Sequence, residues 1–245
     1  MKKLMFAVAA VAAGVAMADV TSANIVGYAG SDLRDAGATL TSALFMNVSS
    51  PDGSLKLSNI VPVKADGDVA GWWEVEIQYL NFDGSTDFDH DYLWNGENWE
   101  NADMEDMSDV EVPAGQGLFV GNSTGVAVNF RSSGELNQKD VVFTLRDAGA
   151  TAAGNCFPTT TTLGELLPQI KDSEDVPGWW ELEIQYLNFD GSTDFDNDYM
   201  WNGENWENAD MEDMSELTIN PGQGLFIGNS TGKAVTLRIP APEIK

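Results

Sequence analysis

The sequence lacks most of the residues on which common catalytic sites depend. It contains one histidine, His90, whose counterpart in a second copy of the same segment is Asn197. A Ser-His or Cys-His catalytic set, or an ordinary zinc site, therefore cannot be present in both copies. A glycine-rich phosphate-binding motif is also missing, because Gly115-Gln116-Gly117 is better explained as a turn before a strand. These absences predict a protein that is not an enzyme and that has no organic cofactor.

Cysteine is almost absent as well. Cys156 is the only one, so an intramolecular disulfide is excluded. The thiol either is a small buried residue or pairs between two chains. Free cysteine is among the most buried residue types, which favours the first interpretation.

Basic residues are few. The chain has 12 Lys and Arg against 39 Asp and Glu, a formal net charge of −27. Two of the 12 and none of the 39 lie in residues 1–18, so a chain that begins at Asp19 carries −29. Such a charge argues against nucleic acid and anionic lipid as partners, because both would be repelled. It favours solubility and a cation or a basic partner. The candidate partners are cations, glycans or other surface proteins.

Long apolar segments are missing beyond the N-terminus. Lys2 and Lys3 precede an apolar stretch at residues 4–15, and Ala16-Met17-Ala18 fits a small-x-small cleavage site. Residues 1–18 are therefore predicted to be a signal peptide, since the apolar stretch is too short for an ordinary membrane span. We expect an exported protein that does not span the membrane, located in the periplasm, at the cell surface or outside the cell.

What the chain does contain is an internal repeat. Residues 71–108 align with residues 178–215 at an offset of 107, and 35 of these 38 positions are identical. Upstream, residues 33–39 recur as residues 145–151 at an offset of 112. Copies of about 100 residues have an ordinary domain size. The predicted boundaries are a signal peptide at 1–18, one β-domain at 19–131, a linker containing Ser132-Ser133-Gly134 at 132–139, and a second β-domain at 140–245.

The repeated segment has the pattern of a three-stranded meander. Residues 72–82 alternate between apolar and polar, and Asp83-Gly84 and Asn95-Gly96 are typical centres of two-residue hairpin turns. These turns predict cross-strand pairs that all lie on one apolar face: Trp73 with Trp94, Val75 with Tyr92, Ile77 with His90, Tyr79 with Phe88 and Tyr92 with Trp99, and their counterparts in the second copy.

Further short strands, and one helical turn opened by a capping box at residues 162–167, complete the predicted elements. Six or seven short strands in each copy suit a sandwich or a small barrel. The predicted fold is therefore all-β with minor helix: two tandem, similar β-sandwich or small β-barrel domains.

The same register places carboxylates on the opposite face of the meander. Glu76 is predicted to lie opposite Asp91, and Asp91 opposite Glu100. Like charges in direct opposition destabilise a sheet, so the face is either screened by solvent or occupied by a cation. Clustered oxygen ligands suit Ca²⁺, although the spacing does not fit an EF-hand. The candidate metal ligands are Glu76, Asp89, Asp91, Glu100, Glu183, Asp196, Asp198 and Glu207.

All eight tryptophans lie in the two meanders. Large aromatic side chains on the apolar face of a sheet usually form core, whereas exposed ones can stack on sugar rings. The alternation places Trp72 and Trp179 on the acidic face. These two residues are therefore the candidates for stacking against a glycan.

Several short motifs occur together. Residues 22–28 read Ser-Ala-Asn-Ile-Val-Gly-Tyr, residues 92–96 and 199–203 read Tyr-Leu/Met-Trp-Asn-Gly, and residues 115–119 and 222–226 read Gly-Gln-Gly-Leu-Phe. This combination resembles a loose group of exported β-repeat proteins of Verrucomicrobia and related bacteria that have no assigned function. The resemblance implies export and a β fold, and it assigns no activity and no functional residues.

Two main classes of function remain. The first expectation is a secreted or cell-surface protein with a structural or interaction role and no catalysis. The alternative is a module that binds Ca²⁺, a carbohydrate or both. Carboxylates that flank a cleft can cleave glycosides, so a glycoside-active enzyme is the third alternative.

Overall fold

The computed structural model describes residues 26–47, 50–79, 91–185 and 198–242. These residues form several small antiparallel sheets, together with two 3-10 helices and no α-helix, which confirms the all-β prediction. None of the helices in this part of the chain has the length and apolar character needed to cross a membrane.

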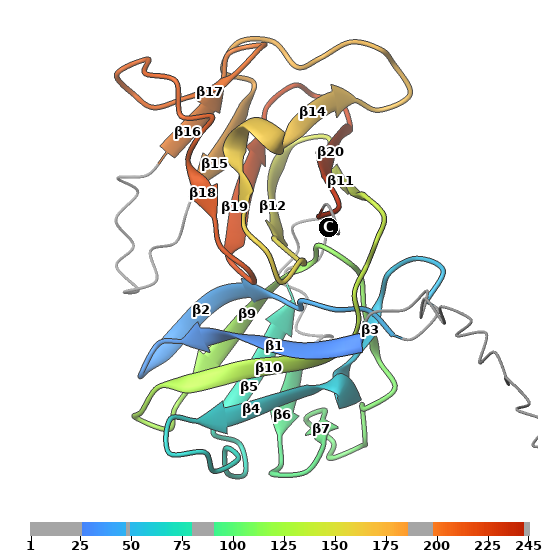
Figure 1. The fold of residues 1–245 in the computed structure, drawn as a ribbon, viewed down its shortest axis with the longest axis vertical. Coiled ribbons are helices and arrows are strands. Elements are labelled where there is room, and N and C mark those ends of the chain that lie inside the picture. The colour runs from blue at the N-terminus through green and yellow to red at the C-terminus, as the bar shows by residue number, and fades with distance from the viewer. Residues whose placement is uncertain (1–25, 48–49, 80–90, 186–197, 243–245) are drawn as a thin grey trace, which may run out of the picture.

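The first copy consists of a three-stranded sheet, a five-stranded sheet and a short two-stranded ladder (Figure 1). The three-stranded sheet has the order β1 (Val26–Leu33), β10 (Val128–Glu135), β4 (Ile60–Lys64). The five-stranded sheet has the order β2 (Gly37–Ser42), β9 (Gly117–Asn122), β5 (Val75–Tyr79), β6 (Asp91–Trp94), β7 (Trp99–Glu100). The ladder pairs β3 (Leu55–Lys56) with β8 (Glu111–Val112), and η1 (Leu57–Asn59) follows β3.

The second copy repeats this arrangement sheet by sheet. Its three-stranded sheet has the order β11 (Val141–Leu145), β20 (Val235–Ile239), β14 (Leu167–Ile170). Its five-stranded sheet has the order β12 (Gly149–Gly154), β19 (Gly224–Asn229), β15 (Leu182–Gln185), β16 (Asp198–Trp201), β17 (Trp206–Glu207). The ladder pairs β13 (Thr161–Thr162) with β18 (Thr218–Ile219), and the predicted helical turn is η3 (Leu163–Glu165).

Each copy has its own hydrophobic core, made of buried side chains from both its three-stranded and its five-stranded sheet. Trp99 is fully buried in the first core and contacts Phe130 of the other sheet edge to face, with ring centroids 6.3 Å apart. Its indole N–H donates to the carbonyl of Ile60 at 2.9 Å. Trp206 makes the corresponding bond to Leu166 at 3.0 Å. These tryptophans therefore fill the core and satisfy their single polar group inside it.

The turn between β6 and β7 lies one residue later than predicted. Trp94 pairs with Trp99, and the Asn95 N–H donates to the Asn98 carbonyl at 3.0 Å, so Gly96, at φ 104°, begins the tip. The Asn95 side chain accepts hydrogen bonds from the backbone of the two residues that follow Gly96, and this interaction selects the turn position. A turn displaced by one residue shifts the strand pairing by two. Each side chain therefore keeps its face but has a different neighbour.

The register of the first hairpin is shifted by two residues as well. Ile77 pairs with Tyr92 rather than with His90, and the predicted pairs Val75–Tyr92 and Tyr92–Trp99 are wrong. The second copy has the same shifted register. The predicted turn at residues 83–84, and the predicted partners at positions 88 and 90, lie outside the described residues.

Residues 132–135, which were expected in a linker, belong to strand β10. Ser132 is buried, pairs with both neighbouring strands, and accepts a hydrogen bond from the Leu44 N–H at 3.1 Å. A Ser-Ser-Gly sequence is typical of linkers, but small side chains also permit close packing inside a sheet. The connection to β11 therefore runs over residues 136–140.

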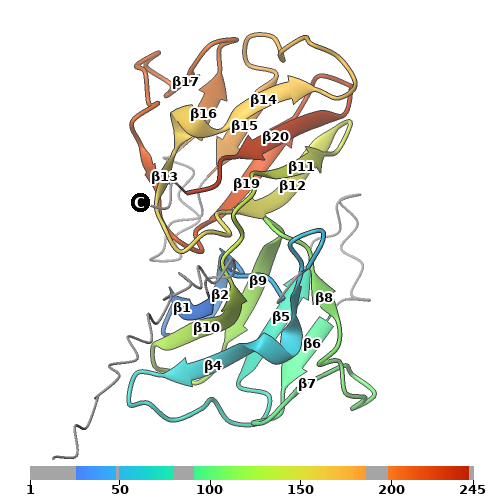
Figure 2. The same ribbon diagram turned by 45° about the vertical axis from the view of Figure 1, so that its right-hand side comes forward.

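The two copies meet where strands of their five-stranded sheets end (Figures 1 and 2). Isolated bridges join Thr41 to Gln223 and Ala153 to Gln116. By the offsets of the repeat, Thr41 corresponds to Ala153 and Gln116 to Gln223. Each bridge is therefore the counterpart of the other.

Backbone hydrogen bonds at this junction follow the same symmetry. The Ser42 N–H donates to the Gly222 carbonyl, and the Gly154 N–H donates to the Gly115 carbonyl, both at 3.0 Å. Ser42 corresponds to Gly154 in the repeat, and Gly222 corresponds to Gly115, so the two bonds are equivalent. The contact between the copies thus resembles the isologous interface of a two-fold dimer, formed within one chain.

Candidate functional site

Two adjacent tryptophans are exposed in each copy. Trp72 is 59% and Trp73 43% exposed, and their ring centroids lie 4.5 Å apart at a tilt of 34°. In the second copy Trp179 and Trp180 are 59% and 46% exposed, 4.7 Å apart and tilted by 37°. Each copy therefore presents a two-ring aromatic surface to solvent.

The backbone at Trp73 turns its side chain out of the sheet. The Trp73 N–H donates to the Trp94 carbonyl at 2.6 Å, although Trp73 lies in a turn before strand β5 and is not part of the strand pairing. Its φ, however, is 58°, a left-handed conformation that is unfavourable for a bulky residue. Trp180 has φ 60° and the same bond, to Trp201, at 2.7 Å. The predicted core positions of Trp73 and Trp180 are therefore wrong, because the strand begins only at the second residue after each.

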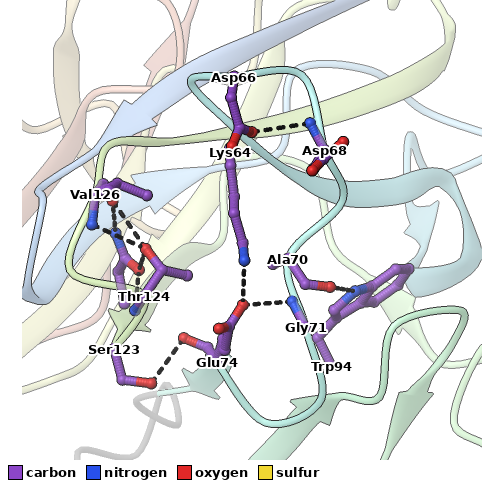
Figure 3. Close-up of polar contacts among 11 residues, drawn as sticks. Lys64, Asp66, Asp68, Ala70, Gly71, Glu74, Trp94, Ser123, Thr124 and Val126 are labelled. Carbon is purple, nitrogen blue, oxygen red and sulfur yellow. Dashed lines mark hydrogen bonds and ion pairs between the residues drawn. The ribbon is translucent and has the colours of Figure 1, made fainter.

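Hydrogen bonds around Glu74 hold this loop in place (Figure 3). The Glu74 carboxylate accepts the Gly71 N–H at 2.5 Å and forms an ion pair with Lys64 at 2.8 Å. Its backbone carbonyl accepts the Ser123 N–H at 2.8 Å, at the end of β9. The Lys64 ammonium, and then the Gly71 N–H, hold the pKa of Glu74 below its usual value. The loop that carries the two indoles is thus tied to β9 and to the end of β4.

The buried side chain of Trp94 also holds the loop through a hydrogen bond. Its indole N–H donates to the Ala70 carbonyl at 3.0 Å, immediately before the loop (Figure 3). In the second copy Pro177 occupies the position of Ala70, and within the described part of the chain the indole nitrogen of Trp201 is buried without a hydrogen-bond partner. Lys64 is also replaced: it pairs with Val128, and the residue that pairs with the equivalent Val235 is Ile170. The exposed surfaces of the two copies are therefore alike, while their supports differ.

A second strained turn adds an exposed methionine to each site. Met104 has φ 60° and is 63% exposed. The turn is closed by the Asn101 side-chain oxygen, which accepts the N–H groups of Asp103 at 3.0 Å and Glu105 at 2.9 Å. Met211 has φ 61°, the same exposure and the same set of bonds. Backbone strain at two exposed apolar residues in each copy is typical of functional sites.

One tryptophan and the methionine of the second copy line a hollow. In the second copy the hollow has a volume of about 540 Å³ and is lined by Trp179, Asn202, Gly203, Glu204, Glu207 and Met211. Within it, the Asn202 side-chain amide donates to the Glu207 carboxylate at 2.5 Å. The first copy has identical residues at every equivalent position, and Asn95 makes the same bond to Glu100 at 2.5 Å.

The chemistry of the hollow suits a ligand with one apolar face and a hydroxylated rim. An indole face and a thioether provide apolar contact, while the amide and carboxylate provide hydrogen-bond donors and acceptors beside it. A pyranose ring has both features. The surrounding carboxylates disfavour anionic ligands.

The predicted Ca²⁺ site does not have the predicted geometry. Glu76 pairs with Leu93, and Leu93 with Glu100, so a hydrophobic residue separates the two glutamates across the strands. Asp91 pairs with Gln78 instead of lying between them. The two-residue register shift is the reason. The prediction that three carboxylates lie directly opposite one another is therefore wrong in the first copy.

The second copy shows the same arrangement. Glu183 and Glu207 flank Met200, and Asp198 pairs with Gln185. Asp89 and Asp196 lie outside the described residues. Among the residues that the structure describes, no group of three or more His, Cys, Asp or Glu side chains is positioned to hold a metal ion. Ca²⁺ binding stays a prediction that this geometry does not favour.

Asp91 nevertheless has an unusual environment. Burial, and then the neighbouring Glu76 carboxylate, raise the pKa of Asp91 to about 7. Its Oδ1 atom is buried without a hydrogen-bond partner among the described residues. Glu76 and Asp91 are diagonal neighbours across β5 and β6. The repulsion between carboxylates that was expected on this face is therefore present between these two residues.

Sequence reasoning selected Trp72 and Trp179 and missed Trp73, Trp180, Met104 and Met211. A signal existed for the methionines, because Asn-Ala-Asp-Met-Glu is a polar, turn-like segment in which a single large apolar residue stands out. No local signal identifies Trp73, since the strand pattern includes it.

Comparisons with known proteins contribute no further assignment. No protein-family model matches the chain. Comparisons with curated proteins and with solved structures also found no match.

Proposed function

We propose that this protein is an exported, non-catalytic binding protein. It is built from two tandem β-sandwich domains, and each domain binds neutral carbohydrate chains through its exposed tryptophan pair. The observation that carries the proposal is the pair Trp72–Trp73, repeated as Trp179–Trp180. Both pairs are exposed, and in both the second residue is held in a strained backbone conformation.

Duplication of the exposed surface supports binding over a purely structural role. The residues of the hollow are the same in both copies, whereas the supporting residues at Lys64 and Ala70 are not. Exposed indoles also cost solubility, and these four belong to neither hydrophobic core, so packing does not explain them. A retained aromatic surface with a polar rim is best explained by a ligand.

Charge selects the ligand class. The net charge of −27, with Glu204 and Glu207 lining the hollow, opposes uronic acids and sulfated or phosphorylated glycans. Neutral polysaccharides with pyranose backbones satisfy both the stacking surface and the charge. Export, through removal of residues 1–18, brings the protein to the compartment where such polymers occur.

Affinity electrophoresis tests the proposal directly. The acidic protein migrates readily in native gels, and we expect its mobility to fall in gels that contain a soluble mixed-linkage β-glucan, xyloglucan or galactomannan. A variant with all four exposed tryptophans changed to alanine is expected to migrate as it does without polysaccharide. The matched control is Tyr28→Ala, which removes another exposed aromatic side chain, at 78% exposure, outside the hollow.

Two results would contradict the proposal. One is equal mobility of the wild-type protein with and without each polysaccharide. The other is retardation that persists in the four-tryptophan variant, because binding would then use a different surface. Far-ultraviolet circular dichroism of the variant confirms that it is folded before either result is interpreted.

A further inference from the structure

The exposed tryptophan pairs lie at opposite ends of the molecule. Strand β9 touches the other copy at its first residue, Gly117, while the residue after its last, Ser123, anchors the loop of the first pair through Glu74. Strand β19 repeats this relation from Gly224 to Ser230, which binds the Glu181 carbonyl at 2.9 Å. Figures 1 and 2 show the start of β5 and the start of β15 at the two far ends of the long axis.

The separation follows from strand geometry. A strand rises about 3.3 Å per residue, so six residues of β9 place the first loop roughly 20 Å from the junction. The same length of β19 separates the second loop from the junction on the other side. The two sites therefore lie on opposite sides of the junction, up to roughly 40 Å apart.

The junction between them is built as a fixed contact. Thr41 is buried, and its hydroxyl donates to the Gly222 carbonyl at 2.7 Å and lies 2.6 Å from the Ser31 hydroxyl. Gln116 is also buried, and its backbone forms a bridge with Ala153 of the other copy, while its side-chain amide is satisfied within its own copy by the Gly117 carbonyl at 2.8 Å. Buried polar groups that are hydrogen-bonded across an interface favour one geometry, because any other leaves them unpaired.

We propose that the protein is a bivalent cross-linker, which holds two separate carbohydrate chains, one at each end. This inference rests on the proposed function, because it assumes that each tryptophan pair binds a glycan. Two sites on one face would add their contacts along a single chain. Sites at opposite ends instead connect two chains, and the pseudo-two-fold junction sets the distance between them.

Light scattering with one-site variants tests the inference. The double variants Trp72→Ala/Trp73→Ala and Trp179→Ala/Trp180→Ala each keep one site, and both are compared with the wild-type protein in a solution of the polysaccharide that retards it. We expect scattering to rise with the wild-type protein, to reach a maximum, and to fall again when excess protein fills every chain singly. Each one-site variant is expected to bind without this rise.

The outcomes separate the two proposals. If the one-site variants bind and the wild-type protein scatters no more than they do, cross-linking is wrong and the binding function stands. If neither the wild-type protein nor any variant binds, the proposed function itself fails. Scattering of the wild-type protein without polysaccharide must stay at the level of a monomer, since a rise there would assign the effect to self-association and overturn the inference.

Discussion

The backbone of Trp73 pairs with that of Trp94, yet their side chains occupy opposite environments. Their N–H···O distance is 2.6 Å, while the indole of Trp94 is buried and that of Trp73 is 43% exposed. The left-handed φ of 58° at Trp73 causes this divergence. A residue whose main chain is hydrogen-bonded to the edge of a strand thus contributes its side chain to the surface.

Substitutions at Trp73 distinguish the cost of its backbone strain from the role of its side chain in binding. Glycine adopts a positive φ without steric cost, whereas the left-handed conformation costs other residues about 1–2 kcal/mol. We expect Trp73→Gly to be more stable than Trp73→Ala by about 1 kcal/mol in urea unfolding, and both to lose carbohydrate binding at the first site. Equal stability of the two variants would show that the loop relaxes in the absence of the indole.

The ion pair of Lys64 with Glu74 is specific to the first copy. We expect Lys64→Ile, which introduces the residue found at position 170, to lower the urea midpoint at low ionic strength and to have no effect in high salt. Because the pKa of Glu74 is lowered in the folded state, this contribution is present above its unfolded value and is lost as pH falls through the folded one. Glu74→Gln, alone and combined with Lys64→Ile, completes a double-mutant cycle, and additive effects would contradict the pair.

Asp91 makes stability depend on pH near neutrality. Its pKa of about 7 in the folded state lies above the unfolded value of about 3.9. Between these values the folded protein keeps a proton that the unfolded chain has lost, so stability falls as pH rises and the decline ends above about pH 7.

Asp91→Asn removes this titration. The melting temperature of the variant is expected to exceed that of the wild-type protein at about pH 8 and to converge with it near pH 4. Glu76→Gln removes the second cause of the raised pKa and is expected to give a smaller effect of the same sign. Parallel pH curves for Asp91→Asn and the wild-type protein would contradict the assignment.

Cys156 is expected to be unreactive in the folded protein. It is 4% exposed, and burial raises the pKa of its thiol to about 12, so the nucleophilic thiolate is scarce at ordinary pH. A thiol-reactive dye at about pH 8 should label the chain completely in denaturant and negligibly without it. Cys156→Ser provides the blank in both states. Rapid labelling of the native protein would instead indicate an accessible thiol.

A substitution at Gly224 tests how much the junction between the copies contributes to stability. A Cβ atom at this position would lie 2.3 Å from Cγ of Leu40 in the other copy, so Gly224→Ala is expected to cost about 1–3 kcal/mol and to separate the unfolding of the two copies into distinct transitions. Gly228→Ala is the matched control in the same strand, because its nearest contact would be 3.9 Å away. Calorimetry that gives the same single transition for both variants would contradict a tight junction.

Much of the fold follows from the sequence pattern, and the part that fails does so for a definable reason. Alternation from Val75 to Gln78 correctly predicts which side chains point to the core, because the period of a strand is a local property. The choice of turn centre depends on one side chain, Asn95, which folds back onto the residues after it. That choice shifted the pairing of β6 with β7 by two, so Trp94 keeps its buried face and pairs with Trp99, while Glu100 lies opposite Leu93 instead of Asp91.

The candidate site was predictable only in part. Trp72 stands out because the alternation places it on the polar face. Trp73 does not, because its conformation depends on Glu74 binding the Gly71 N–H and on Ser123 at the end of a strand far along the chain. Exposure at this position is a consequence of long-range contacts, which a local pattern does not contain.

The sequence by itself determined the duplication, the acidic charge, the β architecture and the inward or outward direction of each strand residue, since these depend on composition and local periodicity. Only the tertiary structure decided which strand ends meet at Thr41 and Gln223, and therefore that the two aromatic pairs lie on opposite sides of the junction. The physical reason is that backbone hydrogen bonds between the copies depend on distance in space and leave no periodic trace in the chain.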